Sequence, residues 1–455
     1  MAKKESQVKP NSASAEKGIT KITVAGYKSI SQEQSIEIRP LTILAGANSS
    51  GKSSMMQPLL LLKQTLEASY DPGALRLDGP NVRFTSTDQF LSHVGNGKHV
   101  NAFHVGIDVE GNSSSTIFFH RRLNRTLEVR RMISISMEGK IDLRLGMSDK
   151  EMLSGELPEF IKKVLTIFLE SEGNWRLNVV QDRCFFKVEL TQKEDLGITV
   201  DVPIINDLVL SLDKHIRELI HLPGLRGNPE RTYLVAAAGS NFAGTFENYT
   251  ASVIAKWQAD RNNRKLEELG QDLKSLGLTW KVLANALNDT QVELQVGRLP
   301  QPSKAGKSDM VSIADVGVGV SQTLPVLVAL HAAKPGQLVY IEQPEIHLHP
   351  RAQTAMAQIL AKAAKRGVRV VVETHSSLLI LGVQTLVAEG EISPDLIKLH
   401  WFERRNGRTE ITSRDLDETG AFGDWPEDFA DVVLEAQSRY LDAAESRVRS
   451  KRRAS

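Results

Sequence analysis

The alternation of hydrophobic and polar residues predicts α/β structure at both ends of the chain. Near the N-terminus, two predicted strands precede a third, which runs directly into a Gly/Ser loop and an apolar helix starting near Lys52. Near the C-terminus, apolar strands and helices alternate tightly over residues 311–382. The predicted strands of these two regions are residues 19–30, 35–38, 41–44, 337–341 and 368–373.

The middle of the chain is predicted to combine antiparallel strands with helices. Polar residues alternate with β-branched or aromatic residues in its strands, and its helices show helical periodicity. The predicted strands are residues 80–145, 174–204 and 292–296, and the predicted helices are residues 150–170, 206–221 and 250–288. One α/β core split by an insertion explains this order better than consecutive independent domains do.

Composition restricts the class of protein. The 455 residues suffice for two or three domains, and 41% of them are hydrophobic, so a sizeable core can form. Lys and Arg total 56 against 55 Asp and Glu, which excludes a globally basic nucleic-acid coat but leaves a local basic face open. The single cysteine, Cys184, excludes a disulfide framework and fits a reducing compartment. No secretion signal or membrane-spanning run is found, so we expect a cytoplasmic protein that does not bind membranes.

A phosphate-binding loop is predicted at residues 46–53. The sequence matches G-x-x-x-x-G-K-[ST] in full, with a hydrophobic strand before it and a helix after it. Glycines let successive backbone N–H groups face the phosphates, and the helix N-terminus adds partial positive charge. Lys52 can reach the β- and γ-phosphates, and the Ser53 hydroxyl can bind Mg²⁺. The predicted ATP-binding residues here are Gly46, Asn48, Ser49, Ser50, Gly51, Lys52, Ser53 and Ser54.

Two later strands carry polar residues at their C-terminal ends, where ligands bind in open α/β sheets. Glu342 follows the strand at 337–341 and fits the acidic residue that holds Mg²⁺ beside a phosphate loop, usually through water. His375 follows the strand at 368–373, so we favour a γ-phosphate contact over a role as a core histidine. Both residues are therefore candidate catalytic residues.

His347 and His349 form an H-x-H pair that could bind a metal ion. No third ligand is apparent nearby, and Pro350 places the pair at the start of a helix. A structural or interface role is therefore favoured, and zinc is not expected.

Four ordered motifs resemble the ABC-type ATPases of the SMC, RecF and OLD-like branch. They are GANSSGKSS at 46–54, DVGVGVSQTLPVL at 315–327, YIEQPEIHLHP at 340–350 and VVVETHSSLLI at 370–380. Within this branch the chain looks most like bacterial "AAA family" proteins with a small C-terminal domain of unknown function. Stretches at 220–233 and 420–433 support that subgroup, and the resemblance covers roughly residues 19–435, weakly over 100–215.

The resemblance implies an α/β fold: an ABC-type P-loop ATPase head with an antiparallel β lobe, a helical insertion and a small C-terminal appendage. It also implies a head-to-head homodimer, or a higher homo-oligomer, that sandwiches two ATP molecules. Each ATP would contact the phosphate loop of one subunit and the signature segment of the other. The signature candidates are Gly317, Gly319, Ser321 and Gln322, and the departure from L-S-G-G-Q leaves open which of them makes the contact.

The motifs set the expected domain organisation. The expected parts are a disordered tail (1–18), the N-terminal part of the ATPase head (19–105), an inserted β/α region (106–225), a helical lobe and linker (226–310), the C-terminal part of the head (311–405), a small C-terminal domain (406–446) and a basic tail (447–455).

The resemblance also suggests residues outside the four motifs. Lys28, with Ser29 beside it, resembles the basic residue on the nucleotide side in this branch. Gln89 is the candidate Q-loop residue that senses Mg²⁺ and water, with Asp88 as the alternative. The arginines of the loop at 226–231 could approach the nucleotide or only brace the lobes.

The residue after the Walker B acid departs from the pattern of transport-type ABC ATPases. Gln343 stands where those enzymes have a catalytic glutamate, and an amide can position water but cannot take its proton. Either Glu345 serves as the base, or hydrolysis is slow and ATP mainly holds the dimer together. We expect turnover below the usual median of about 10 s⁻¹.

Two functions fit these features. The first is an ATP-hydrolysing switch in anti-phage defence or DNA metabolism that controls a separate effector, because too few residues follow the ATPase region to form an OLD-like nuclease domain. Double-stranded DNA is a candidate partner through the arginines at 121–131 or the basic tail. A solvated strand face explains the insert arginines equally well, and a solubilising role is slightly favoured for the tail. The second is an ATP-dependent oligomeric scaffold that sequesters a protein partner, with hydrolysis incidental. A transporter ATPase is disfavoured by the large insert.

Overall fold

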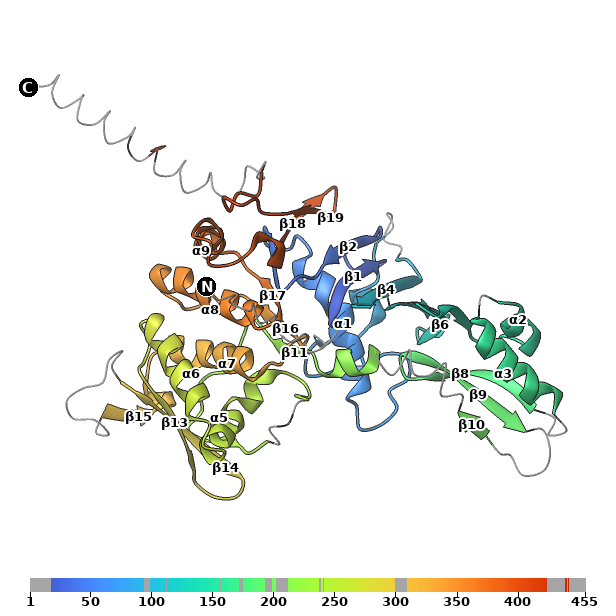
Figure 1. Cartoon of the computed structure of the whole chain (residues 1–455), viewed down its shortest axis with the longest axis horizontal. Helices are drawn as coiled ribbons and strands as arrows, with labels where there is room; N and C mark the ends of the chain where they lie inside the picture. Colours follow the sequence, from blue (N-terminus) through green and yellow to red (C-terminus); the bar gives the residue numbers. More distant parts are fainter. Residues whose placement is uncertain are drawn as a thin grey trace, which may run out of the picture.

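The structure is a computed structural model that describes most of the chain from residue 18 to residue 423. The gaps are 94–98, 112, 156, 172–174, 193–198, 202–211, 237–238, 240 and 299–308, and residues 438, 439 and 441 are also described. The predicted N-terminal tail, the basic tail and most of the predicted C-terminal domain lie outside the described residues. The molecule is elongated, with a helical end, a central sheet region and a distal α/β end (Figure 1).

A six-stranded sheet in the order β11-β16-β17-β3-β18-β19 forms the centre. Its first five strands run parallel, and β19 pairs antiparallel with β18. The strands are β3 (Leu41–Gly46), β11 (Ile220–Leu222), β16 (Leu338–Glu342), β17 (Arg369–Glu373), β18 (Ile397–Arg405) and β19 (Arg408–Arg414). The expected domain boundary between residues 405 and 406 therefore falls in the turn of the β18–β19 hairpin, inside this sheet.

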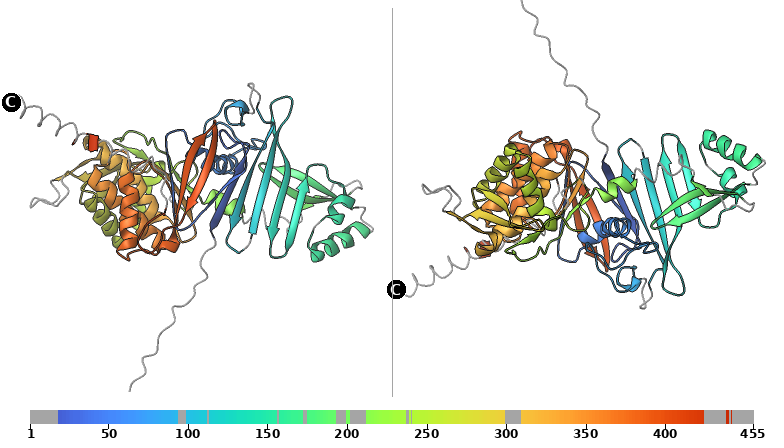
Figure 2. Two further views of the ribbon diagram at one scale, coloured as in Figure 1. Left: turned by 90° about the horizontal axis from the view of Figure 1, so that it is seen from above. Right: turned by 90° about the horizontal axis from the view of Figure 1, so that it is seen from below.

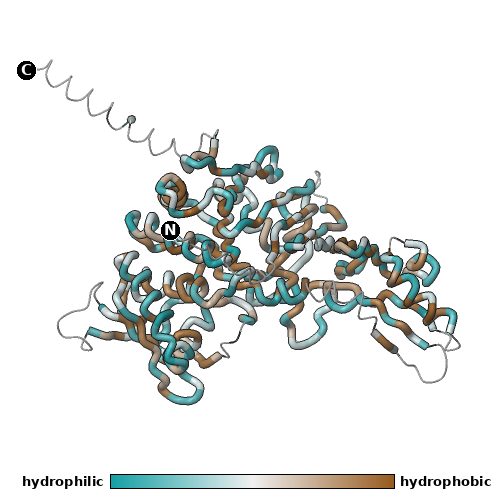
Figure 3. The backbone as a smooth tube through the Cα atoms, in the orientation of Figure 1, coloured by the Kyte–Doolittle hydropathy of each residue, from teal (hydrophilic) through white to brown (hydrophobic). Residues whose placement is uncertain are grey.

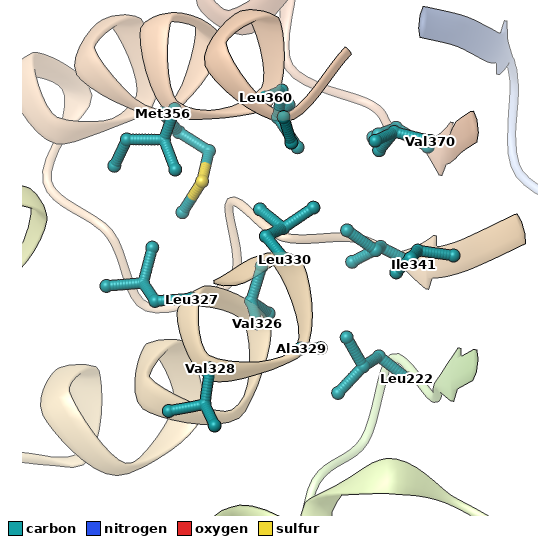
Figure 4. Packing of buried hydrophobic residues seen from close by; sticks show 14 of the residues in the cluster. Leu222, Val326, Leu327, Val328, Ala329, Leu330, Ile341, Met356, Leu360 and Val370 are labelled. Atoms are coloured by element: carbon teal, nitrogen blue, oxygen red, sulfur yellow. The ribbon is translucent and has the colours of Figure 1, made fainter. Parts of the chain in front are cut away.

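Successive residues of the central strands alternate between two hydrophobic clusters. In β16, Val339 and Ile341 belong to the cluster shared with α7, α8 and α9, whereas Tyr340 belongs to the cluster shared with α1. The helices are α1 (Lys52–Leu66), α7 (Val318–Ala332), α8 (Pro350–Lys365) and α9 (Ser377–Ala388). Figure 4 shows Leu327, Leu330, Met356 and Leu360 filling the space between these helices and the strand residues Leu222, Ile341 and Val370.

An antiparallel lobe packs over α1 as a second six-stranded sheet, in the order β2-β1-β4-β5-β6-β7. Its strands are β1 (Ile19–Ala25), β2 (Gln34–Glu37), β4 (Ala102–Val109), β5 (Ser113–Arg121), β6 (Leu127–Ser136) and β7 (Gly139–Arg144). Figure 2 shows these strands side by side from above and below. The predicted strands at 80–145 are thus confirmed only from Ala102 onward, because Phe84 instead packs tilted against Phe90, and Phe90 stacks on Tyr27, around the short helix η1 (Thr87–Gln89).

The distal end beyond this lobe combines two helices with a three-stranded sheet. These elements are α2 (Asp149–Ser154), α3 (Glu159–Glu170), β8 (Trp175–Asp182), β9 (Phe185–Gln192) and β10 (Thr199–Asp201). Both the helical and the strand predictions for this region are confirmed. The helix predicted at 206–221 is described only from residue 212 and is helical over 212–217. Its end was predicted wrongly, because Ile220–Leu222 is the fully buried edge strand β11 beside β16.

The helical end contains α5, α6 and a small sheet that pack on α7. Its elements are η2 (Phe246–Tyr249), α5 (Thr250–Ala259), α6 (Asn263–Ser275), β12 (Tyr233–Leu234), β13 (Val282–Ala286), β14 (Gln291–Gly297) and β15 (Met310–Ser312), with η4 (Ile313–Asp315) and η5 (Pro394–Leu396) elsewhere in the C-terminal half. The helix predicted at 250–288 was too long. Gly277, with a φ of 70°, follows α6, and Val282–Ala286 then pairs with β14 as β13.

Hydrophobic segments gather inside the helical end and along the central strands (Figure 3). Within the described part of the chain, no helix combines the length and the apolar character needed to cross a bilayer.

His400 of β18 joins the central sheet to the antiparallel lobe. Its Nε2 donates to the Glu37 carbonyl and its Nδ1 lies beside the Ser413 hydroxyl, each at 2.8 Å. Burial lowers the pKa of His400 to about 4. Because an unfolded histidine titrates near pH 6.5, the unfolded state takes up the proton first as the pH falls. The free energy of unfolding should therefore be highest above pH 6.5 and fall by about 3 kcal/mol towards pH 4 through this residue.

Urea denaturation of the wild type and of His400→Gln across this pH range measures the contribution of His400. The variant should lose less stability than the wild type on acidification, by about the same 3 kcal/mol. Identical losses would show that His400 is not the responsible group.

Candidate nucleotide-binding site

The phosphate loop lies where β3 passes into α1, and its backbone requires two of its glycines. Gly46 has a φ of 137° and Gly51 a φ of 108°, in the region that favours glycine. A Cβ on Gly46 would lie 2.2 Å from the Phe402 carbonyl oxygen of β18, and one on Gly51 would lie 2.2 Å from Thr409 Oγ1 of β19. The β18–β19 hairpin therefore packs directly on the loop and determines its shape.

Lys52 and Ser53 occupy the first turn of α1. Lys52 Nζ donates to the carbonyls of Gly46, at 3.1 Å, and Ala47, at 2.8 Å. Burial lowers the pKa of Lys52, and the nearby carboxylates of Glu373 and Glu345 oppose that shift. A lysine held over the loop at a helix N-terminus is the arrangement that binds phosphate.

A pocket of about 460 Å³ opens beside the loop. Its lining includes four cationic side chains, Lys28, Lys52, Arg404 and Arg408, but one carboxylate, Glu373. This charge balance favours an anionic ligand. Seven of the predicted residues line the pocket: Lys28, Ser49, Gly51, Lys52, Ser53, Ser54 and Gln89. Arg404 and Arg408 were not predicted, because no local pattern ties this late hairpin to the loop.

The two Q-loop candidates have different surroundings. Gln89 lines the pocket, and its side chain bonds Thr85, accepting from the backbone N–H at 2.8 Å. Asp88 instead pairs with Arg121 of the antiparallel lobe. Of the two candidates, only Gln89 faces the pocket.

Lys28 also lines the pocket. It has a φ of 47°, and its Nζ lies 5.0 Å from the centre of the Phe84 ring.

Glu342, the predicted Walker B acid, is bonded towards the edge strand β11. Its Oε1 lies 3.2 Å from His221 Nε2, and its Oε2 accepts from the Gly224 N–H at 3.1 Å. Burial favours the protonated form, but these hydrogen bonds outweigh it and hold the pKa of Glu342 below its ordinary value. Glu342 is therefore an ionised carboxylate at the end of β16.

Glu373 lies opposite Glu342 in the register of β16 and β17 and was missed by the sequence analysis. Ser53 Oγ lies 3.0 Å from its Oε1 and 2.8 Å from its Oε2, and the Tyr340 hydroxyl donates to Oε2 at 2.9 Å. Burial and the nearby Glu342 charge raise the pKa of Glu373, and the Ser53 hydrogen bond works against them. The sequence feature that could have identified Glu373 is its position directly before Thr-His-Ser at the end of a strand.

Glu345 connects the loops that follow β16 and β17. Its Oε1 accepts from the Thr374 hydroxyl and from the His375 N–H, both at 2.8 Å, whereas its buried Oε2 has no partner among the described residues. Burial raises the pKa of Glu345. Burial and the Lys52 charge lower the pKa of His375, against a hydrogen bond with the Gly46 backbone.

Gln343 has a φ of 46° and donates its backbone N–H to the Glu373 carbonyl at 2.7 Å. The predicted catalytic residues Glu342, Gln343, Glu345 and His375 therefore gather at the ends of two adjacent strands. None of these four residues lines the pocket itself, whereas Glu373 does.

The predicted signature segment begins α7. Gly317 is the exposed N-cap of the helix and Gly319 is partly exposed. Ser321 Oγ donates to the Val318 carbonyl at 3.0 Å. Gln322 is 5% exposed and donates to two carbonyls of the 226–227 loop, so its side chain faces the interior of its own subunit. Accessible backbone is therefore concentrated at Gly317 and Gly319.

Arg226 and Arg231 brace the signature segment and do not line the pocket. Arg226 is 7% exposed and donates to the carbonyls of Gln322, at 3.3 Å, and Glu342, at 2.8 Å. Arg231 forms an exposed ion pair with Asp315, with Nη2 2.7 Å from Oδ1. The loop after β11 thereby connects the start of α7 with the end of β16.

Replacing each arginine by Met should separate the buried contact from the exposed one. Arg226→Met is expected to lower the free energy of unfolding by about 3 kcal/mol, because two carbonyls lose a buried charged donor. Arg231→Met should cost at most about 1 kcal/mol, because exposed ion pairs contribute little. Urea denaturation measures both, and equal losses would contradict the assignment of Arg226 as the structural brace.

Several residues of the remaining charged motifs have structural partners. The His349 side chain caps α8 by accepting from the Arg351 N–H at 3.3 Å, with Pro350 in the first turn. Three insert arginines are ion-paired: Arg121 with Asp88, Arg122 with Glu128 and Arg131 with Asp142. Arg447, Arg449, Lys451, Arg452 and Arg453 of the basic tail lie outside the described residues.

The donor atoms beside Lys52 suit Mg²⁺. Magnesium is usually bound by one or two carboxylates together with substrate phosphates and water. The Ser53 hydroxyl and the Glu373 carboxylate provide such oxygen donors at the pocket wall. Across the described residues, no group of three or more His, Cys, Asp or Glu side chains could hold a metal by itself. A magnesium ion here would therefore be shared with nucleotide phosphates.

The fold and the site together place a complete phosphate loop at the carboxyl end of a parallel strand, the arrangement of P-loop nucleotide-binding proteins. A family model described as "AAA domain, putative AbiEii toxin, Type IV TA system" matches residues 281–381, which contain the signature segment, the β16 end and the His375 loop. The matched stretch is 101 residues long (381 − 281 + 1), less than a quarter of the chain. A search of curated proteins gives no significant match.

Solved SMC head domains are similar to this chain. An SMC head bound to the C-winged helix domain of ScpA has 14% identity and a TM-score of 0.45, over 88% of this chain and 98% of that one. The head from Thermotoga maritima has 10% identity and a TM-score of 0.38, over 87% and 98%. A head with a coiled coil and joint from Pyrococcus yayanosii has 10% identity and a TM-score of 0.44, over 92% and 100%. These scores are too low to carry residue roles across, so the site rests on this chain's own geometry.

Proposed function

We propose that this chain binds and hydrolyses ATP with Mg²⁺ and works in the cytoplasm as a nucleotide-gated dimeric switch that controls a separate effector, in anti-phage defence or DNA metabolism. The observation that carries the proposal is the cationic pocket beside an intact phosphate loop, with Lys52 and Ser53 at its wall. Bound Mg²⁺ would neutralise charge on the β- and γ-phosphates. The chain's own part is to hold the triphosphate between α1 and the β18–β19 hairpin.

Exposed features at the start of α7 support dimerisation across the nucleotide. Gly317 leaves the N-terminus of this helix accessible, and backbone N–H groups at a helix N-terminus attract phosphate. Val318 is 48% exposed and Leu225, in the loop braced to α7, is 90% exposed. A second copy bringing its ATP to this helix would cover both apolar side chains.

A role in defence is supported by the family model, whose description names a toxin of a type IV toxin–antitoxin system. DNA is the other candidate input, but ion pairing of Arg121, Arg122 and Arg131 leaves fewer free charges on the insert than the sequence suggests.

The second candidate function is a scaffold that assembles with ATP and sequesters a protein partner. Gln343 favours it, because an amide at the position after the Walker B acid cannot accept a proton from water. In that case ATP binding, and not its hydrolysis, would set the assembly state.

Steady-state ATP hydrolysis with and without double-stranded DNA, recorded together with the molecular mass with and without ATP, separates the two functions. DNA-stimulated turnover with ATP-dependent dimers supports the switch. ATP-dependent assembly with negligible turnover that ignores DNA supports the scaffold. A monomer that neither binds nor hydrolyses ATP would overturn both.

A further inference from the structure

Two carboxylates lie at the same level on the α1 side of the central sheet. Glu342 and Glu373 end β16 and β17 and are direct neighbours in the parallel register. Tyr340 and Val371, each two residues earlier on its strand, both belong to the cluster around α1, so both carboxylates lie on that side. The level and the side of the sheet therefore do not decide which of the two carboxylates reaches the phosphate loop.

The strand order gives the two carboxylates different neighbouring strands. β16 has β11 on one side and β17 on the other, whereas β17 lies directly beside β3, which leads into the phosphate loop. Glu342 has one oxygen bonded to His221 of β11 and the other to the Gly224 N–H just after it. These two hydrogen bonds point away from β3, towards the edge of the sheet, and the Tyr340 hydroxyl is a further hydrogen-bond partner of the Glu342 carboxylate.

Glu373 has the opposite set of contacts. Both of its oxygens lie within 3.0 Å of Ser53 Oγ, and the carboxylate lines the pocket beside Lys52. Tyr340 holds it from the other side through its hydroxyl, at 2.9 Å. The Tyr340 ring is itself stacked on the His221 ring, with centroids 5.5 Å apart and planes 8° apart. The tyrosine is thereby fixed between the two carboxylates.

We propose that Glu373, and not the Walker B residue Glu342, is the carboxylate that binds the Mg²⁺ of MgATP together with Ser53. Glu342 is then a positioning residue, which anchors the loop after β11 and keeps His221 stacked on Tyr340. This inference rests on the proposed function, because it requires a nucleotide in the pocket. It differs from the expectation for P-loop proteins, in which the Walker B acid, here Glu342 at the end of β16, has this role.

The test compares two isosteric substitutions, Glu373→Gln and Glu342→Gln, in the full-length chain. Calorimetry measures the affinity for the non-hydrolysable analogue AMP-PNP, first in EDTA and then with excess Mg²⁺. The ratio of the two affinities is the metal enhancement. Each substitution removes one negative charge from a neighbouring position, so a difference between them reports direct contact with the metal and not a general change in electrostatics.

Glu373→Gln is expected to reduce the metal enhancement by about ten- to hundredfold, the loss typical of disturbing a metal site. Glu342→Gln should leave most of the enhancement. Glu373→Asp keeps the charge but withdraws it from Ser53 by one methylene, so an intermediate loss is expected; this variant decides the case if Glu373→Gln fails to fold. The inference is overturned if Glu342→Gln removes the enhancement, or if both Glu373 variants keep it.

The EDTA measurement tests the proposed function separately. Metal-free AMP-PNP binding that depends on Lys52 supports the nucleotide site before any metal is added. If wild type and Lys52→Ala bind equally weakly in EDTA and with Mg²⁺, the nucleotide site itself is refuted, and the assignment of Glu373 with it.

Discussion

ATP turnover is expected to fall by about 10²- to 10³-fold in Lys52→Ala, the loss seen when a preorganised cationic or hydrogen-bonding group is removed from a transition state. In this structure Lys52 Nζ sits over the loop carbonyls of Gly46 and Ala47 at the wall of the cationic pocket. Removing it leaves the pocket with less positive charge at the point nearest the helix N-terminus. Steady-state phosphate release measures the effect.

Lys21→Ala is the matched control for this experiment. Lys21 is an exposed lysine on β1, outside the pocket, so the same chemical change there should leave turnover unaltered. Similar losses in both variants would mean that the effect reflects charge or stability, and Lys52 would lose its assigned role.

Turnover is also expected to fall by about 10²-fold or more in Glu345→Gln, within the range that a general base contributes. The raised pKa of Glu345 makes it a better proton acceptor than an ordinary carboxylate, and its Oε2 has no partner among the described residues. Gln343 can orient water but not deprotonate it. Single-turnover hydrolysis measures the chemical step, and AMP-PNP affinity measured in parallel shows whether the variant still binds nucleotide.

The control for Glu345 removes its structural contact and keeps its carboxylate. Thr374→Val deletes the hydroxyl that donates to Glu345 Oε1 at 2.8 Å but leaves the His375 N–H in place. Only a small loss of turnover is expected. If Glu345→Gln retains wild-type turnover, or if Thr374→Val costs as much, Glu345 braces the two loops and is not the base.

Local patterns predicted the elements that build the pocket floor. The phosphate loop needs glycines, a lysine and a hydroxyl at fixed spacing, so residues 46–53 identify themselves from sequence alone. The ends of β16 and β17 were recognisable for the same reason, as apolar strands followed by polar residues. The central strands are continuous apolar runs because each is buried on both faces.

Contacts between distant segments were beyond the sequence analysis. β11 has three residues and is a strand only because β16 offers it a partner, so its helix-like pattern misled the prediction. The residues of β13 were predicted as part of a helix for the same reason, because their pairing with β14 cannot be recognised from the local pattern. Glu373 was overlooked because its partner Ser53 lies 320 positions earlier, and the acidic residue next to His375 carries no motif of its own.

The position of β3 determines when the nucleotide site can form during synthesis. β3 ends at Gly46, and its two neighbours begin at Arg369 and Ile397, which are 323 and 351 positions later (369 − 46 and 397 − 46). A ribosome adding about 5–20 residues per second needs tens of seconds to make that length, and the antiparallel lobe and insert emerge in the meantime. Both edges of the apolar strand β3 therefore stay unpaired during most of translation. We expect a chaperone to bind the nascent chain over this time, because β3 is made long before the strands that pair with it.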